Sequence, residues 1–146
     1  MRLAELLQPG DVAIRFRASD LTTAASTLLR GALVRHRVAD ATIESIMKAV
    51  GERESEGSTL CGTIGLPHAR DKRVDGIIAA VGLNPDGVLE GRREPRIVIA
   101  FVSPEGKRDE HLHFLSEAAR LSRDVARVDR IVNAADEGAA IEAMRG

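Results

Sequence analysis

The sequence STLCGTIGLPHAR, residues Ser58–Arg70, places two glycines in a short apolar run that ends on a proline followed by a histidine. Gly62 and Gly65 permit tight or close-packed backbone, because glycine has no Cβ. Pro67 fixes its own φ angle and has no N–H, so it interrupts a regular strand. We therefore expect His68 to be held rigidly where a short strand ends.

Length and charge limit the class of protein. The chain has 146 residues, which suffices for one core but not for two ordinary domains, so we expect residues 1–146 to form a single domain. Its 21 basic and 22 acidic residues give a net charge of -1, without the positive field of a general nucleic-acid binder. Only 2% of the residues are aromatic, so stacking on bases is not expected to drive recognition. We expect no nucleic-acid partner.

Cysteine content and hydropathy indicate the compartment. The single cysteine, Cys61, cannot form an internal disulfide, and we interpret it as a small apolar filler. The sequence shows no signal-peptide pattern and no apolar run near the roughly 20 residues that span a membrane. We expect a cytoplasmic protein without membrane insertion. No His-x-His strand motif or Cys-x-x-Cys spacing occurs, so we expect neither a metal nor another cofactor.

Turn signals and hydrophobic periodicity predict alternating helices and strands. Strands are expected at residues 12–16, 74–83 and 96–102 and in the run before His68; helices at 1–10, 21–35, 40–54, 110–123 and 136–145, with 128–132 a short strand or a helix end. Asp20, Asp40 and Asp109 are expected to cap the helices that follow them. The apolar run 96–102 is typical of a central strand buried on both faces. This order predicts an α/β fold, with a single mixed, mainly parallel β-sheet flanked by helices on both faces.

The second long helix carries a buried stripe at helical spacing. The stripe consists of Ile43, Ile46, Met47 and Val50. The same period continues to Arg53 and Glu54, which are polar. Polar residues that extend a buried stripe lie at the rim of the core and face the segment that follows in space. Arg53 and Glu54 are therefore expected to face the glycine-rich run that leads to His68.

Helical geometry separates the remaining histidines. At about 100° per residue, His111 shares a helical arc with Leu115 and faces inward, in a first turn whose N–H groups and dipole favour an anion. His113 lies about 200° from Leu115 and should face water. His36 follows a helix end, and we interpret it as a charge feature of that end without a chemical role.

Several segments occur in a specific order along nearly the whole chain. They are Arg53-Glu54, Gly57-Ser58-Thr59, Gly62 with Ile64–Arg70, Phe101–Glu105, and His111-Leu112 followed by Leu115. Together they resemble the enzyme IIA domains of the mannitol and fructose type in the bacterial phosphoenolpyruvate-dependent sugar phosphotransferase system, including the nitrogen-regulatory IIA proteins. Between Thr59 and His68 the chain is one residue shorter than the usual pattern, and Gly65 stands where alanine is common.

The resemblance implies a phosphotransferase that works through a phosphohistidine. His68 would be phosphorylated by the phosphocarrier HPr, and the group would pass to a IIB domain, usually onto a cysteine. The family's second histidine falls on His111 and its arginine on Arg53.

Phosphoryl transfer requires mainly positioning and charge stabilisation, and a neutral imidazole is a competent nucleophile near pH 7. This chemistry fits His68 as the acceptor, with its other ring nitrogen held as a donor by a carbonyl or carboxylate. His111 can donate a hydrogen bond to the phosphoryl oxygens, and Arg53 can supply charge-assisted bonds.

Other polar residues have both a functional and a structural interpretation. Thr59 or Ser58, with backbone N–H groups near Gly62, can complete a phosphate site, or they can be ordinary turn and cap residues. The basic clusters Arg70–Arg73 and Arg92–Arg96 are typical of solvated loop charge, which can also steer an acidic phosphodonor.

Three functions remain open. The leading hypothesis is a phosphoryl carrier in a sugar relay. The main alternative is a regulatory protein of the same fold, in which phosphorylation of His68 controls binding to a kinase or transporter. The third is a binding domain that has lost phosphotransfer through its shortened loop.

Overall fold

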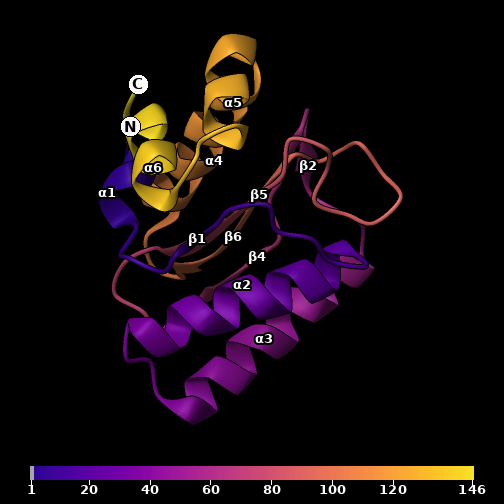
Figure 1. The fold of residues 1–146 in the computed structure, drawn as a ribbon. Helices are drawn as coiled ribbons and strands as arrows, with labels where there is room; N and C mark the ends of the chain where they lie inside the picture. Colours follow the sequence, from indigo (N-terminus) through magenta and orange to yellow (C-terminus); the bar gives the residue numbers. More distant parts are fainter. Residues whose placement is uncertain (1) are drawn as a thin grey trace.

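The chain folds around one sheet with helices on both sides (Figure 1). A computed structural model describes residues 2–146. Its helices are α1 (Arg2–Leu6), α2 (Leu21–Arg35), α3 (Asp40–Ser55), α4 (Arg108–Ser122), α5 (Val125–Val132) and α6 (Glu137–Arg145). Its strands are β1 (Val12–Ala13), β2 (Leu60–Cys61), β3 (Ile64–Gly65), β4 (His68–Asp71), β5 (Ile78–Leu83) and β6 (Ile97–Pro104).

β6 is the central strand of the sheet, as its continuous apolar run predicts. The strands follow the order β1-β5-β6-β3-β2, and β4 also pairs with β6. The β1–β5, β3–β6 and β4–β6 pairings are parallel, whereas β5–β6 and β2–β3 are antiparallel. Every residue of β6 is buried, because it has strands along both edges and helices over both faces. The predicted mixed, mainly parallel sheet is confirmed.

β3 and β4 form one interrupted edge along β6. The register against β6 is the same before and after the interruption, and His68 pairs with Phe101. Between the two strands, Leu66 donates its N–H to the Thr59 carbonyl at 2.8 Å, and Pro67 has no N–H to donate. His68 therefore begins a strand. The expectation that it lies where a strand ends is wrong, because the chain resumes pairing directly after the proline.

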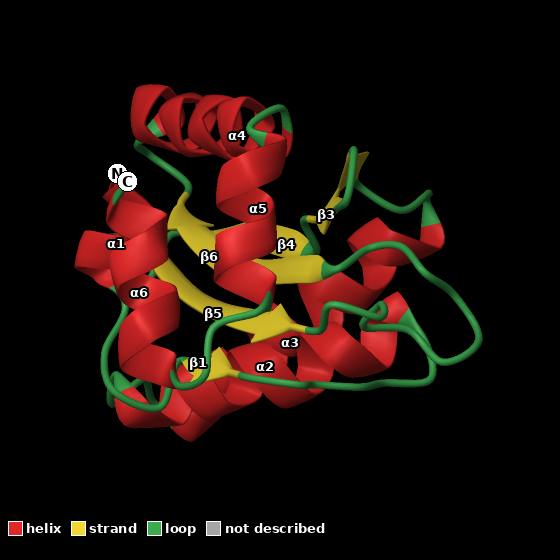
Figure 2. Cartoon of the chain, turned by 45° about the horizontal axis from the view of Figure 1, so that its top comes forward, coloured by secondary structure: helices red, strands yellow, loops and turns green. Residues whose placement is uncertain are grey.

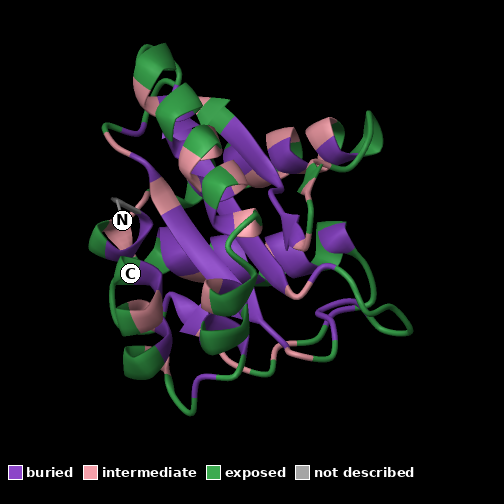
Figure 3. Ribbon diagram, turned by 90° about the horizontal axis from the view of Figure 1, so that it is seen from above, coloured by how far each residue is buried: buried purple, intermediate pink, exposed green. Residues whose placement is uncertain are grey.

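Alternation along β6 divides the core into two halves. Odd-numbered residues from Ile97 to Phe101 pack under α1, α4, α5 and α6, and even-numbered residues from Val98 to Val102 pack against α2 and α3 (Figure 2). Burial follows the strands and the inner faces of the helices, while the outer helix faces are exposed (Figure 3). Helices cover both faces of the sheet, as predicted.

Several predicted elements differ from the observed ones in extent. The helix expected at 1–10 spans Arg2–Leu6, and the strand expected at 74–83 spans Ile78–Leu83. The strand expected at residues 12–16 is limited to Val12–Ala13, because Arg15 has a φ angle of 51°, outside the β region. Residues 128–132 form the end of helix α5, the second of the two alternatives.

Three aspartates cap helices by accepting a backbone N–H; one of them is Asp124, which caps α5. Asp20 and Asp136 each accept a backbone N–H and cap α2 and α6. Asp40 and Asp109 are already inside α3 and α4, so their prediction as caps is wrong. A cap residue has non-helical backbone, and ahead of α3 that residue is Ala39. In the first turn the two carboxylates still complement the helix dipole.

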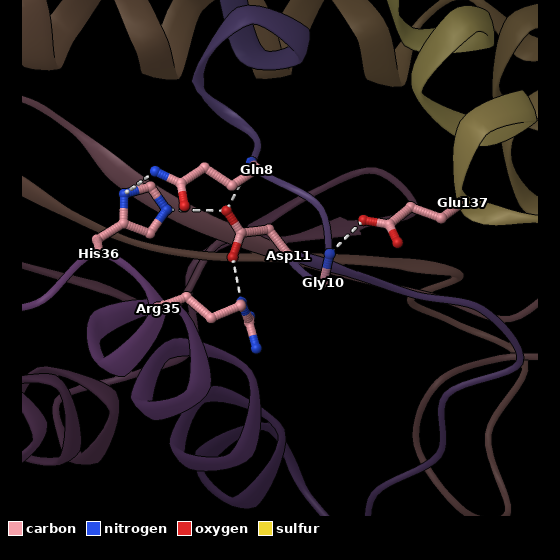
Figure 4. A network of polar contacts seen from close by, with 6 residues as sticks. All are labelled: Gln8, Gly10, Asp11, Arg35, His36 and Glu137. Atoms are coloured by element: carbon pink, nitrogen blue, oxygen red, sulfur yellow. Dashed lines mark hydrogen bonds and ion pairs between the residues drawn. The ribbon is translucent and has the colours of Figure 1, made fainter.

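A buried carboxylate joins the start of the chain to the end of α2 (Figure 4). Asp11 is 1% exposed, accepts a hydrogen bond from Arg35 Nε at 2.7 Å and lies 2.9 Å from His36 Nε2. Gln8 donates its backbone N–H to the same carboxylate at 2.8 Å. His36 lies at a helix end as predicted, and its contact with Asp11 holds the α1–β1 connection against α2.

Candidate active site

His68 opens β4 and is 9% exposed. Its Nδ1 lies 2.7 Å from the carbonyl oxygen of Leu66. A carbonyl oxygen only accepts, so Nδ1 carries the ring proton and Nε2 carries the lone pair. No group in the described part of the chain makes a hydrogen bond to Nε2. The partner expected for the second ring nitrogen is thus the Leu66 carbonyl, and Nε2 is the atom available for chemistry.

Phe101 fixes the plane of the His68 imidazole. It lies directly across from His68 on β6, and the two rings stack with centroids 4.7 Å apart and an interplanar angle of 10°. Phe101 is itself fully buried and packs against Phe114 of α4, with ring centroids 4.5 Å apart. A ring stacked on one face and bonded at Nδ1 has little rotational freedom. Nε2 of His68 is therefore held in one direction.

His111 of α4 supplies the second ring. Its centroid lies 5.3 Å from that of His68, with an interplanar angle of 52°. Nδ1 of His111 is 2.5 Å from the hydroxyl oxygen of Ser103, which is 0% exposed. That hydroxyl has no other acceptor among residues 2–146, so we assign it as donor to Nδ1, which leaves the proton of neutral His111 on Nε2. The two rings thus have opposite tautomers.

Burial lowers the pKa of both histidines below the ordinary value, and loss of hydration is the largest cause in each. The bond to the Leu66 carbonyl acts in the opposite direction on the pKa of His68, while the positive charges of Arg53 and Arg70 lower it further. His68 and Arg70 also lower the pKa of His111. Both rings are therefore neutral at pH 7, as a nucleophile and a neutral donor require.

Arg53 lies in the last turn of α3, at the rim of the core where its stripe predicts it. Its Nη1 donates to the Gly57 carbonyl at 3.0 Å, which anchors the side chain while other N–H groups of the guanidinium remain. The structure thus brings His68 and His111 together, with Arg53 at the end of α3 where its charge acts on His68.

Glu54 has a buried carboxyl group next to Ser58 and Thr59, in the segment that precedes His68. It is 8% exposed, and its Oε1 has no hydrogen-bond partner in the described part of the chain. Burial raises the pKa of Glu54, and the Ser58 hydroxyl, the Thr59 N–H and Arg53 oppose that effect. Ser58 and Thr59 are therefore associated with Glu54 at the end of α3.

Gly62 is not brought to the histidine pair. It forms the turn between β2 and β3 with a φ angle of 58°, and the nearest side chain to it is that of Ser122, the last residue of α4. At about 1.5 Å per residue, Ser122 lies about 16 Å along the helix from His111. The positive φ angle gives a structural reason for glycine at this position, and its neighbour Ser122 places it at the end of α4 away from His111.

Two residues near the histidine pair, Ser103 and Arg70, were not predicted to belong to the site. Ser103 follows Phe101 by two positions on β6, and Arg70 follows His68 by two positions on β4, so all four side chains belong to one face of the sheet. Arg70 lies in a strand and not in a loop, but its side chain is exposed, as expected for a solvated charge. Alternation along each strand predicts that Arg70 shares a face with His68 and that Ser103 shares a face with Phe101. Only the pairing of β4 with β6 shows that the two faces are the same. His113, by contrast, is exposed and contacts Glu117 Oε1 at 2.9 Å, as its outward position predicts.

Comparison with known proteins identifies the family of the chain. The sequence matches the family described as "Phosphoenolpyruvate-dependent sugar phosphotransferase system, EIIA 2" over residues 5–145. The chain belongs to this family. It is therefore a phosphoryl carrier of the phosphotransferase system, as its sequence motifs imply. A comparison with curated proteins gives no significant match.

Solved structures of EIIA proteins share the fold. The nitrogen regulatory protein IIA-Ntr from Neisseria meningitidis superposes with a TM-score of 0.79 at 16% identity over 99% of both chains. IIA mannitol from Escherichia coli gives 0.75 at 18% identity, over 94% of this chain and 98% of that one. The complex of enzyme IIAMtl with phosphorylated IIBMtl from E. coli gives 0.74 at 19% identity, over 96% and 97%. No helix within residues 2–146 has the length and apolar character needed to cross a membrane.

Proposed function

We propose that this EIIA protein accepts a phosphoryl group from phospho-HPr on Nε2 of His68 and passes it to a IIB domain. The observation that carries the proposal is the pair of imidazoles 5.3 Å apart, one with a lone pair on Nε2 and the other with an N–H on Nε2. Residues 1–146 would act as one domain, and the exchange with HPr would take place in the cytoplasm.

In the proposed step, the lone pair on Nε2 of His68 forms a bond to phosphorus while the bond between phosphorus and the donor atom of phospho-HPr breaks. The donor atom keeps that electron pair. The proton on Nδ1 of His68 stays in place, hydrogen-bonded to the Leu66 carbonyl, so the ring becomes a phosphoimidazolium. Its positive charge makes Nε2 a good leaving group. When a nucleophile of IIB attacks phosphorus, the P–N pair returns to Nε2 and the neutral ring is restored.

The surrounding side chains stabilise charge on the transferred group. The N–H on Nε2 of His111 can donate to a phosphoryl oxygen, and the Arg53 guanidinium can supply charge-assisted bonds. Phe101 stacks on the His68 ring and limits the directions in which Nε2 can point. Positioning and charge together are what phosphoryl transfer requires of a protein.

A regulatory role is the second candidate. The similarity of fold to nitrogen regulatory protein IIA-Ntr over 99% of both chains supports it, and the complex of mannitol IIA with phosphorylated IIB supports the relay. In the regulatory case, the phosphorylation state of His68 would control binding to a kinase or transporter. Both functions begin with the same transfer to Nε2.

Labelling of a matched pair of histidine variants tests the common step. Wild type, His68→Ala and His113→Ala are incubated with phosphoenolpyruvate, enzyme I and HPr, and acid-labile phosphate is counted. His113 is the control because its side chain is 61% exposed and lies outside the ring pair. We expect labelling of wild type and His113→Ala and none of His68→Ala. Label that persists in His68→Ala would exclude this acceptor, and an unlabelled wild type would favour a domain that has lost phosphotransfer.

The relay and the regulatory role separate at the next step. The labelled protein is mixed with a purified mannitol-type IIB domain, and loss of label from His68 is followed by rapid quench. Discharge on mixing with appearance of label on IIB supports the relay. Retained label, together with partner binding that differs between the two phosphorylation states, supports regulation.

A further inference from the structure

We propose that Arg70 is a second phosphoryl-binding cation, which holds the group on His68 from the β4 side of the site. This inference rests on the proposed function, because it assigns a residue to the phosphoryl group that His68 would carry. Neither the expected roles of Arg53 and His111 nor the family match assigns a function to Arg70.

Strand pairing places Arg70 at the site. β4 runs parallel to β6, with His68 across from Phe101 and Arg70 across from Ser103. Paired residues on neighbouring strands share a face, as do residues two apart on one strand. Arg70 therefore follows His68 on the face covered by α4. Its partner across the strands, Ser103, is the residue that contacts His111.

A hydrogen bond to the loop before α4 orients the Arg70 guanidinium. Its Nη2 donates to the carbonyl oxygen of Glu105 at 2.9 Å, just after the end of β6 and ahead of the helix that carries His111. That contact uses one of the five N–H groups of the guanidinium, and the other four have no partner in the described part of the chain. The Glu105 carbonyl thus anchors the side chain while leaving donors for an anion.

Electrostatics agree with this placement. The charge of Arg70 lowers the pKa of both His68 and His111. Of these two histidines, only His68 has its pKa lowered by Arg53. Arg70 thus acts on both rings that flank the phosphoryl position. Three elements would then hold the group: α3 through Arg53, α4 through His111 and β4 through Arg70.

Arginine and lysine differ in how they bind a phosphoryl group. Arginine can bond two phosphoryl oxygens at once, whereas lysine acts as a point charge. The arrangement therefore predicts that Arg70→Lys recovers only part of what Arg70→Gln loses. A purely structural role for Arg70, which keeps the Glu105 loop in place, would not depend on the phosphorylation state.

The test uses phosphoramidate, a small phosphoryl donor, so that protein docking does not enter the result. Wild type, Arg70→Gln, Arg70→Lys and Arg73→Gln are followed by ³¹P NMR for the rate of phosphorylation and for hydrolysis of the product. Arg73 is the control because it carries the same charge in the same segment and pairs with Asp71 at 2.7 Å. In parallel, the ¹⁵N signal of Arg70 Nε is compared in wild type before and after phosphorylation.

We expect Arg70→Gln to accept phosphate about tenfold more slowly and to lose it faster, the factor that corresponds to one charge-assisted hydrogen bond. Arg70→Lys should be intermediate, Arg73→Gln should match wild type, and the Arg70 Nε signal should shift on phosphorylation. Equal kinetics for Arg70→Gln and wild type, or an Nε signal that does not move, would overturn the inference while leaving His68 as acceptor. If wild-type His68 is not phosphorylated, the proposed function itself fails. If Arg70→Gln does not fold, the lysine variant and the wild-type Nε signal decide.

Discussion

Ser103→Ala removes one oxygen from the core and the hydrogen bond that sets the tautomer of His111. The bond is 2.5 Å long between Ser103 Oγ and His111 Nδ1, and the two residues are 0% and 7% exposed. Water is therefore poorly placed to replace the hydroxyl. In the variant, Nδ1 of His111 no longer accepts a hydrogen bond from the Ser103 hydroxyl, so the ring can carry its proton on either nitrogen.

Burial sets the size of both expected effects. A buried polar atom left without a partner costs about 1–3 kcal/mol, so the free energy of unfolding should fall by about 1–2 kcal/mol. The lost bond also contributes about 1 kcal/mol to the preference for the proton on Nε2, which corresponds to about fivefold in tautomer ratio. We expect phosphoryl transfer to slow by about five- to tenfold. That is less than the roughly hundredfold effect of losing a charge-stabilising donor altogether.

Single-turnover labelling and NMR measure the two consequences separately. Transfer from phospho-HPr is followed by rapid quench, and the imidazole ¹⁵N shifts of His111 report its tautomer. Ser122→Ala is the matched control, because it removes a serine hydroxyl that lies on α4 itself, far from His111, and donates to the Ala119 carbonyl at 2.7 Å. The control should keep the wild-type transfer rate and His111 shifts.

Unchanged His111 ¹⁵N shifts in Ser103→Ala would show that the hydroxyl does not set the tautomer. A changed tautomer with an unchanged transfer rate would show that His111 does not donate to the transferred group. A slower transfer that appears equally in Ser122→Ala would trace the effect to a loosened α4 and not to the ring.

Two further variants test the His68 side of the site. The pKa of His68 in the folded protein is lower than its value of about 6.5 in the unfolded chain. Between these two pKa values the unfolded chain binds more protons, so the free energy of unfolding falls as the pH drops from about 7. His68→Asn retains an N–H for the Leu66 carbonyl and should lose less stability over this range, because only the contribution of His111 remains. Urea unfolding at pH 7.5 and 5.5 measures the difference, and parallel pH curves for the two proteins would contradict it. Phe101→Leu removes the ring stacked at 4.7 Å on His68 and should lower stability by about 1–2 kcal/mol and slow labelling. An unfolding change without any change in labelling rate would show that the stack does not position Nε2.

Much of this molecule could be predicted from local sequence patterns. The continuous apolar run 96–102 predicts a central strand, Asp20 predicts a helix start, and the stripe that ends at Arg53 and Glu54 places these residues at the rim of the core. Such patterns involve residues only a few positions apart, so they can be recognised without knowledge of the fold. They also separated the inward His111 from the outward His113 correctly.

Caps and strand limits were less predictable, because competing local arrangements have similar energies. Asp40 and Asp109 fit a cap as well as a first helical turn, and the backbone of the preceding residue settles which one forms. The strand expected at 12–16 alternates correctly but ends at Ala13, where a following left-handed residue leaves the sheet.

From its own residues the chain specified a histidine after a proline, a second histidine on an inward helix face, and the order of helices and strands around a buried strand. The pairing of β4 with β6 added the rest: Phe101 under His68, and Ser103 opposite Arg70 and bonded to His111. The paired residues of β4 and β6 lie far apart along the chain, and no spacing rule connects Ser103 with His111. Hydrogen bonds between strands and the packing of α4 on the sheet set their register, so the tautomers and charges of the site become visible only in the folded molecule.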